Sequence, residues 1–519
     1  MNELSLMPEK MARRLGVLGL LLLVSVAALL RSRHLDDPLW IDELHTAWAV
    51  SDGLSELVPR AAAGNQAPAA FTLEWLSSAL FGTDELALRL PSCLASLALV
   101  ALLPLVVFRL GGGWSGALLS GLLAVADYWS VVFAGEARPY ALVQLVSLLH
   151  AWCLLGRMGY CGPPSRQAHT WWRVGWLSTA ILLVMLHYTT LLLVLAGMVA
   201  WWLVRGIRRD HDSARSWLLD HLLLGTCCLP LLPHLAMVAA RRANWARFVE
   251  IPSVLDGLAL FPLVPYLAVP LLGWGLVAFR PGRGSEKERQ ENRPLIVLAL
   301  LVVIPLATAW LSTRFDLARL FFPRYLIGIS GLLIVLSGLL IGRLGQSRLF
   351  HLALLLGSLA IGLGVSGEAM RTWQIEARQE YWPALLTFQA DSDPPERLPV
   401  FLCPGLIEDR SLHAELPAPP VAGISLEEFC LFPLSGPYQL HEQPPALLPL
   451  PSSPPGWPAD VEKLARQAGG AWLILRGDED RARRWTRELL DNSLRVRVHE
   501  FGRLYLLRLD HVESSAPGR

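Results

Sequence analysis

The sequence has few charged residues and almost no net charge. Charged side chains make up 17% of its 519 residues, and 45 Lys and Arg against 44 Asp and Glu leave a formal charge of +1. Soluble globular proteins carry about 25% charged residues, so the low charge argues against a soluble protein. The small net charge also argues against a nucleic-acid partner, which would require a basic surface.

Two short signals are missing as well. The seven cysteines form no CxxC motif and no cluster with histidine, which argues against a zinc site. The first apolar run, at 15–30, follows Lys10, Arg13 and Arg14, as the core of a signal peptide follows basic residues, but no clear small-residue cleavage site comes after it. We therefore interpret this run as an uncleaved first membrane helix.

Long apolar runs account for most of the chain. Hydrophobic residues make up 53% of it, and the mean hydropathy is +0.42. A helix needs roughly 20 apolar residues to cross a membrane. The predicted fold class is therefore an α-helical polytopic membrane protein. We expect about eleven spans by this length rule, near 15–30, 86–108, 114–133, 139–156, 174–187, 188–204, 218–236, 259–279, 295–311, 326–341 and 349–366.

The arginines of the loops predict the orientation. With a cytoplasmic N-terminus, most short loops that are rich in Lys and Arg lie inside, as expected for a multi-pass protein of the plasma (inner) membrane. The first outer loop is then 31–85, and residues 367–519 lie outside the cytoplasm. Positive charge on the outer side suggests that these residues hold an anion. Six arginines are placed there: Arg138, Arg241, Arg242, Arg314, Arg319 and Arg324.

Residues 367–519 differ in composition from the transmembrane domain at 1–366. They are rich in proline and contain no run that could span a membrane. Their alternating strands and helices predict a small extracytoplasmic α/β domain, preceded by a helix at 368–388 that leaves the membrane. An oxidising compartment would favour a disulfide between Cys403 and Cys430. Strands are expected at 400–403, 471–477, 494–501 and 504–509, and helices at 461–469 and 478–492.

Two adjacent carboxylates, Asp42 and Glu43, follow the first apolar run in the stretch WIDELHTAW. If this stretch is helical, Asp42 and His45 share a face while Glu43 points elsewhere. The two acids would then differ in role, one as a general base and the other as a partner of an arginine or a helix N-terminus. The structural alternative is that both are solvated loop acids.

Three further stretches carry polar residues at the outer ends of spans. Charge at membrane depth is costly and usually functional, and the planar arginine fork suits a phosphate. The structural alternatives are an ion pair within the first stretch, a packed histidine, and arginines anchored at helix ends. Taken with the acidic pair, these stretches predict a site for an anionic lipid and a proton acceptor. The residues are Glu136, Arg138 and Tyr140 in GEARPY, His187 and Tyr188 in MLHYTT, and Arg324 and Tyr325 in FPRYL.

A transporter or flippase of a lipid-linked anion is an alternative function. Transporters usually place their charges near the bilayer midplane and often contain repeated halves. Here the charges lie at span ends on one side, no repeat is apparent, and a large outer domain follows. A non-catalytic assembly protein is a third hypothesis.

The order of the motifs resembles that of a known class of enzymes. A DE pair in the first outer loop, then EARPY, HY and PRYL within residues 10–370, resembles the GT-C class of membrane glycosyltransferases. The nearest likeness is to the bacterial protein O-mannosyltransferase and aminoarabinose transferase group. This resemblance implies juxtamembrane helices near 41–51 and 67–81. It also implies that a sugar passes from a polyprenyl-phosphate donor to a lipid, glycan or protein acceptor outside the cytoplasm.

The resemblance also implies residue roles. Asp42 corresponds to the catalytic base with Glu43 as its partner, and Arg138, Arg324 and Tyr325 correspond to the residues that bind the donor phosphate. The resemblance implies a hexosyl- or pentosyltransferase, and one base without a covalent intermediate predicts inversion at the sugar. No cofactor is expected; the alternative is a divalent metal that bridges Asp42, Glu43 and Glu136 to the phosphate. Substrate contacts are expected from Glu136, Tyr140, His187 and Tyr188.

Overall fold

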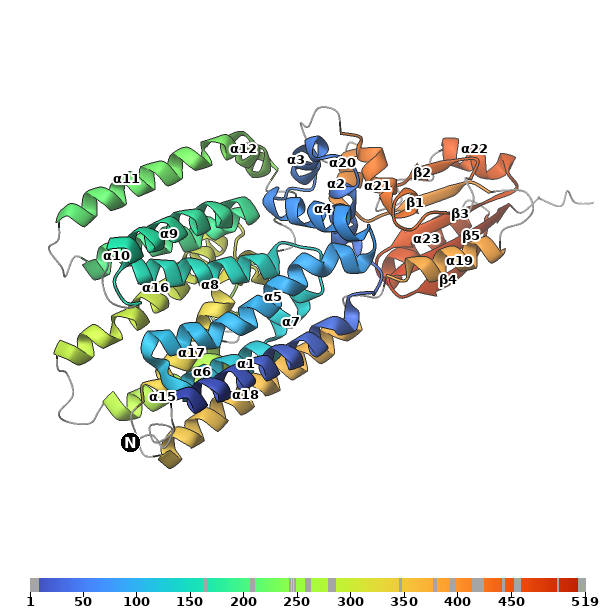
Figure 1. Cartoon of the computed structure of the whole chain (residues 1–519). Helices are drawn as coiled ribbons and strands as arrows, with labels where there is room; N and C mark the ends of the chain where they lie inside the picture. Colours follow the sequence, from blue (N-terminus) through green and yellow to red (C-terminus); the bar gives the residue numbers. More distant parts are fainter. Residues whose placement is uncertain are drawn as a thin grey trace, which may run out of the picture. The chain divides into compact units, whose positions relative to one another are not determined.

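Figure 1 shows the computed structural model of the whole chain. The chain consists of two compact units. The helical unit comprises Met1–Leu35, Ala67–Leu73 and Arg89–Thr372, and the mixed unit comprises Asp36–Gln66, Glu74–Leu88 and Trp373–Arg519. Most of the predicted first outer loop, 31–85, therefore groups with the C-terminal residues. The structure describes residues 9–511 except 162–165, 206–210, 242–243, 245, 247–248, 257–262, 279–285, 345–347, 377–379, 393–397, 413–423, 441–443, 452–458 and 492–493.

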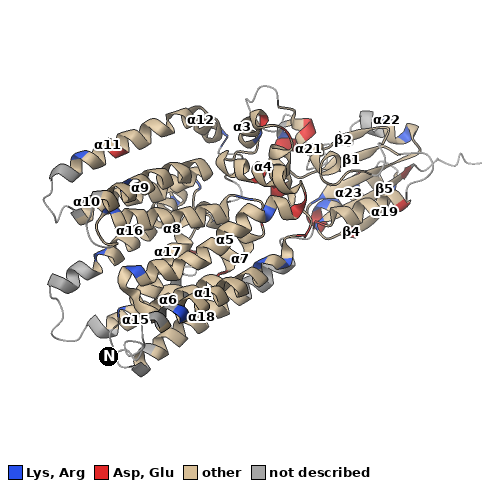
Figure 2. Ribbon diagram, in the orientation of Figure 1, with Lys and Arg blue, Asp and Glu red and all other residues tan. Residues whose placement is uncertain are grey.

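Each of the predicted apolar runs coincides with at least one helix of the helical unit. Figure 2 shows that these helices are mostly uncharged along their length. In chain order, the helical elements that lie wholly or mainly in this unit are α1 (Glu9–Arg31), η2 (Ser32–His34), α5 (Glu85–Val107), η3 (Phe108–Gly112), α6 (Gly113–Ala126), α7 (Tyr128–Ala134), α8 (Tyr140–Arg157), α9 (Arg166–Leu186), η4 (Tyr188–Thr190), α10 (Leu191–Arg205), α11 (His211–Cys228), η5 (Leu229–Leu231), α12 (Leu232–Ala240), α15 (Leu263–Ala278), α16 (Glu286–Arg314), η6 (Pro323–Tyr325), η7 (Ile327–Ile329), α17 (Ser330–Gly342) and α18 (Arg348–Glu376).

Several of these helices have the length and apolar composition of membrane spans. Shorter apolar helices add to them, among them Tyr188–Val204 and Ile327–Gly342. The helical membrane architecture is thereby supported, and the number of eleven crossings stays a prediction. Within the described chain, five segments are long and apolar enough to cross a membrane: Arg14–His34, Glu85–Ala126, Tyr140–Arg157, Ala214–Ala240 and Asn292–Arg314.

Glycine residues bring η3 and α6 into close contact with α17. A Cβ atom on Gly342 would overlap the carbonyl oxygen of Gly112, and one on Gly116 would overlap the carbonyl oxygen of Gly338. The glycines are four residues apart on each side, the spacing that lets membrane helices approach backbone to backbone. This contact fixes the C-terminal half of α17, the helix that follows the FPRYL stretch.

The mixed unit combines short helices with a five-stranded sheet in the order β2-β1-β3-β5-β4. β1 pairs in parallel with β2 and β3, while β5 pairs antiparallel with β3 and β4. Side chains of α22 and α23, including Ala465, Trp485 and Leu489, complete the buried core of the sheet. The strands are β1 (Val400–Cys403), β2 (Leu447–Pro449), β3 (Gly470–Arg476), β4 (Leu494–Phe501) and β5 (Leu504–His511). The helices are α2 (Ile41–Val50), α3 (Leu54–Ala63), α4 (Ala69–Phe81), α19 (Trp382–Ser392), α20 (Ile407–Leu412), α21 (Leu426–Ser435), α22 (Ala459–Gln467) and α23 (Glu479–Asp491).

The α/β character of the C-terminal residues is confirmed, with two corrections. The helix predicted at 368–388 is two helices, because α18 ends at Glu376 and α19 begins at Trp382; residues 377–379 lie outside the described chain. The predicted disulfide is wrong, because Cys403 on β1 and Cys430 on α21 are both free, buried thiols. Burial raises the pKa of both thiols, which therefore stay protonated at neutral pH.

Candidate functional site

Arg138 and Glu136 lie in the short connection between α7 and α8. Both side chains are almost fully buried, with 4% and 2% of their surfaces exposed. The hydroxyl of Ser92 donates a hydrogen bond to the carbonyl oxygen of Arg138 at 3.0 Å, and the Arg138 amide donates to the carbonyl of Glu136 at 2.8 Å. The chain thus holds a buried guanidinium at the start of α8, a position that is costly for a charge unless it is used or compensated.

The three polar stretches of the helical unit meet at this end of α8. The guanidinium carbon of Arg324 lies 5.8 Å from the centre of the Tyr140 ring. The ring of His187 lies 6.0 Å from that of Tyr140 and 5.8 Å from that of Tyr325. Thr189 connects His187 to Tyr325. Its hydroxyl lies 2.7 Å from His187 Nδ1 and donates a hydrogen bond to the carbonyl oxygen of Tyr325 at 2.6 Å. The stretches GEARPY, MLHYTT and FPRYL therefore form one cluster.

Tyr188 and Gln144 extend this cluster to other helices. The Tyr188 hydroxyl lies 2.7 Å from Nδ1 of His234 on α12. One turn beyond Tyr140, the amide of Gln144 donates to the Ser330 hydroxyl at the start of α17 at 2.7 Å. His234 and Gln144 were not selected from the sequence. Gln144 sits within an apolar run, and a polar residue in such a run is the signal that could have identified it.

Asp42 and Glu43, in the mixed unit, occupy the first turn of α2 and differ in environment. Glu43 is fully buried, and its carboxylate accepts a hydrogen bond from the backbone amide of Trp40 at 3.3 Å, which caps the start of the helix. Asp42 is partly exposed. These environments agree with the helical spacing, which places the two acids on different faces.

Contacts with α21 fix the position of α2. The ring of Trp48 stacks on Phe429 with centroids 4.5 Å apart, and its indole nitrogen donates to Glu428 at 3.1 Å. Arg60 on α3 lies over the same Trp48 ring and forms an ion pair with Glu428 at 3.2 Å. A C-terminal helix therefore determines where the acidic pair is held, a role that was not predicted from the sequence.

Asp127 is a buried acid that was not among the predicted site residues. The span predicted at 114–133 is broken there into α6 and α7, and the Asp127 carboxylate accepts hydrogen bonds from the amide and hydroxyl of Ser130 at 2.9 and 2.8 Å. It also accepts one from the Tyr266 hydroxyl at 2.6 Å. An acid within an apolar run is itself a signal of such a site.

A second buried acid, Asp220 on α11, binds two arginines. Arg157 forms an ion pair with it, and Arg173 donates from Nε to both carboxylate oxygens at 2.9 Å. The Arg157 guanidinium also lies 3.7 Å from the centre of the Trp217 ring. This cluster ties α8, α9 and α11 together.

The other arginines that were predicted on the outer side are placed differently. Arg319 donates to the carbonyl oxygens of Ala246 and Val249 at 3.1 and 3.0 Å, so it supports the backbone. Arg314 is exposed at the end of α16, and Arg242 lies outside the described residues. In the described chain, no group of three or more His, Cys, Asp or Glu side chains could hold a metal ion.

Comparison with known proteins yields a likeness of fold. No family model matches the chain, and no curated protein sequence matches it significantly. ArnT from Cupriavidus metallidurans in the apo state matches with a TM-score of 0.58 and 14% identity, over 96% of this chain and 98% of that one. The same protein bound to undecaprenyl phosphate matches with a TM-score of 0.54 and 14% identity, over 98% of this chain and 100% of that one.

The chain has an ArnT-like fold. ArnT is an aminoarabinose transferase of the GT-C class, so the resemblance inferred from the motifs is confirmed at the level of the fold. At 14% identity the likeness does not extend to single residues, and the roles given to Asp42, Arg138 and their neighbours stay predictions.

Proposed function

We propose that the protein is a membrane glycosyltransferase that moves a sugar from a polyprenyl-phosphate donor to an acceptor on the extracytoplasmic side of the plasma membrane. The observation that carries this proposal is the ArnT-like fold, which extends over nearly the whole of both chains. The ArnT structure that holds undecaprenyl phosphate supports the class of donor. The N-terminus is cytoplasmic in this proposal.

Arg138 and Arg324 bind the donor phosphate. As the sugar leaves, the phosphate gains negative charge, and a fixed guanidinium in a site sheltered from water stabilises that charge strongly. The burial of Arg138 and the approach of Arg324 to Tyr140 support this role. Tyr325 belongs to the same group, and the substrate contacts come from Glu136, Tyr140, His187 and Tyr188. Because the arginines supply the positive charge, the proposal includes no metal.

Asp42 is the general base. The acceptor hydroxyl attacks the anomeric carbon, its proton passes to the Asp42 carboxylate, and the bond between the anomeric carbon and the phosphate oxygen breaks. One displacement of this kind inverts the sugar. Glu43 positions the helix, a role supported by its burial and by its capping bond to Trp40.

Mass spectrometry of the cell envelope with and without the gene identifies the transferred sugar and its acceptor. Transfer is then measured with the purified protein in proteoliposomes that contain that donor. We expect Asp42→Asn and Arg138→Gln each to lower kcat by at least about 100-fold, the usual effect of losing a proton acceptor or a charge-stabilising donor.

The matched controls are Asp36→Asn and Arg33→Gln, which remove exposed charges and should leave transfer unchanged. Full activity in Asp42→Asn would refute the assignment of the base. Movement of the donor lipid across the bilayer without a new glycosidic bond would instead identify a flippase.

A further inference from the structure

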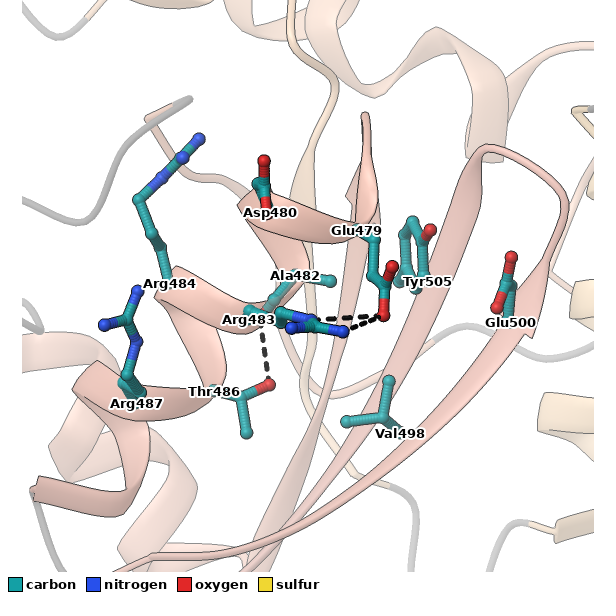
Figure 3. Close-up of a pocket in the computed structure, with 10 residues that line it drawn as sticks. All are labelled: Glu479, Asp480, Ala482, Arg483, Arg484, Thr486, Arg487, Val498, Glu500 and Tyr505. Atoms are coloured by element: carbon teal, nitrogen blue, oxygen red, sulfur yellow. Dashed lines mark hydrogen bonds and ion pairs between the residues drawn. The ribbon is translucent and has the colours of Figure 1, made fainter. Parts of the chain in front are cut away.

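A cleft of about 770 Å³ opens between α23 and the strands β4 and β5 of the mixed unit (Figure 3). Its floor is made by Ala482, Thr486, Val498 and Tyr505. β4 is an edge strand of the sheet, and Val498 on it is 44% exposed, whereas Leu494 on the same face is 5% exposed. The volume lies within the range of sites for small ligands, about 300–1,000 Å³.

Charged side chains surround this α23 cleft, and their charges cancel. Three arginines and three acids line it, and Arg483 is already paired with Glu479 at 2.6 Å. Arg484 and Arg487 have no partner among the described residues, and Figure 3 shows them next to each other on the helix. Glu500 lies across the cleft on β4. The cleft thus offers donors and acceptors in balance instead of a field of one sign.

Tyr505 adds a hydrogen-bonding group to the floor. Only 7% of its surface is exposed, and its hydroxyl has no partner among the described residues. Burial and the nearby Glu500 and Glu479 raise the pKa of Tyr505, so the phenol keeps its proton at neutral pH. The ring is therefore packed into the sheet while the hydroxyl reaches the cleft, where it can donate a hydrogen bond to a ligand and accept one from it.

We propose that the α23 cleft binds the carbohydrate part of the acceptor, an inference that rests on the proposed function. Sugar hydroxyls each donate and accept hydrogen bonds, which matches free guanidiniums, carboxylates and a phenol around a partly apolar floor. A phosphate-rich ligand fits less well, because the acids of the cleft would repel it. A peptide added to the edge of β4 is the competing macromolecular partner.

Binding is measured with the full-length protein in detergent on an array of printed oligosaccharides that carry neutral, amino and uronic acid sugars. We expect binding to at least one of them. Tyr505→Phe keeps the ring but removes the hydroxyl, and should weaken binding about two- to tenfold, the value of one neutral hydrogen bond. Arg487→Gln should weaken it by about tenfold, since a charged donor is lost.

Arg495→Gln is the matched control, because it removes an exposed charge from β4 on the opposite face from Val498 and Glu500. It should bind as the unaltered protein does. If Tyr505→Phe and Arg487→Gln both bind as tightly as the unaltered protein, the inference is overturned. Binding to extended peptides alone, or to no oligosaccharide on the array, would overturn it as well.

The transfer assay separates this inference from the proposed function. If the cleft binds the acceptor, both variants should raise the KM for the acceptor by the factor seen on the array and leave kcat unchanged. Normal KM values in both variants, with transfer intact, would overturn the inference and leave the proposed function in place. Glycan binding by a protein that transfers no sugar would overturn both the proposed function and the assignment of an acceptor site.

Discussion

The helical unit and the mixed unit hold their candidate site residues by different kinds of contact. In the helical unit, neutral hydrogen bonds fasten the segments at the start of α8 and α17, such as those from Ser92 to the Arg138 carbonyl and from Gln144 to Ser330. Direct backbone contact at glycines then fixes α17 against α6.

In the mixed unit, charge and stacked rings hold the helix that carries the acidic pair. Trp48 lies between Phe429 and Arg60, and Arg60 pairs with Glu428. The His45 ring packs edge-on against Phe429 and lies 3.1 Å from the carbonyl of Arg60.

The difference reflects the two surroundings. Within a membrane an ion pair is expensive to desolvate, whereas small residues and neutral hydrogen bonds allow close packing. The ion pair of Arg157 with Asp220 lies at the opposite end of α8 from the candidate site residues. Where water reaches the rim of a contact, long charged side chains can pair without full desolvation, and each pair is individually weak. Substitutions in the glycine contact between α17 and α6 should therefore lower the free energy of unfolding more than substitutions in the contact of α2 and α3 with α21, called the mixed contact.

The largest effect is expected for Gly342→Ala on α17. The added methyl group overlaps the backbone of Gly112, which cannot rotate away, so the two helices must separate. We expect a loss of about 3 kcal/mol or more, at or above the upper end of the usual cost of overpacking. The measurement is the temperature at which Cys93, buried on α5, becomes reactive to a thiol dye in a variant with no other cysteine.

Gly331→Ala on the same helix is the control for that experiment. Its added methyl group would make an ordinary contact, 3.6 Å from Leu99. Alanine also favours the helix over glycine, so Gly331→Ala should be neutral or slightly stabilising. Equal losses in the two variants would show that close backbone contact is not what holds α17.

An intermediate effect is expected for Gly64→Ala at the end of α3. Its methyl group would overlap the ring of His45, which must then leave its position against the Arg60 carbonyl. We expect a loss of about 1–3 kcal/mol from overpacking. Asp42 lies one turn before His45, and kcat should fall by about 10- to 100-fold, because a misplacement of about 1 Å can cost on the order of 100-fold.

Thermal reactivity of Cys430 on α21 and the transfer assay provide the two readouts for Gly64→Ala. Gly53→Ala, at the start of α3, is the control, because the nearest atom to its methyl group is a serine hydroxyl 3.9 Å away. A stable Gly64→Ala protein with full activity would show that the position of His45 does not govern α2.

Most helices and strands of both units could be predicted from the sequence. Long apolar runs located the helices of the helical unit, and short strand-like stretches located β1, β3, β4 and β5. The short strand β2 was not predicted, because its three residues lie among prolines and pair with β1, which is far away in the chain. The order of the motifs also identified the cluster around Tyr140, since polar residues at span ends are rare enough to stand out.

The contacts of α2 could not be predicted in the same way. Trp48 and Glu428 are far apart in the chain, and no local pattern indicates that they meet. The helix α21 itself carried a signal that was overlooked: Ser425 precedes it and accepts a hydrogen bond from the Glu428 amide at 3.1 Å, a serine followed three residues later by a glutamate. Pro433 within the helix obscured that signal.

The smallest effect is expected for Glu428→Gln. Glutamine keeps the acceptor for the Trp48 indole, and Arg60 keeps its second ion pair, with Asp52. Because the Glu428 side chain is 51% exposed, we expect a loss of less than about 1 kcal/mol. That loss should shrink further as salt screens the pair.

The Glu428→Gln experiment follows the thermal reactivity of Cys430 at low and high salt. Glu427→Gln is a close control, because Glu427 is exposed in the same first turn of α21 and has the same charge beside the helix N-terminus. A loss greater than about 2 kcal/mol in Glu428→Gln alone, unchanged by salt, would mean that Arg60 and Glu428 behave as a buried ion pair. A substitution in the mixed contact would then cost as much free energy of unfolding as one in the glycine contact of the helical unit, and the contrast between the two units would not hold.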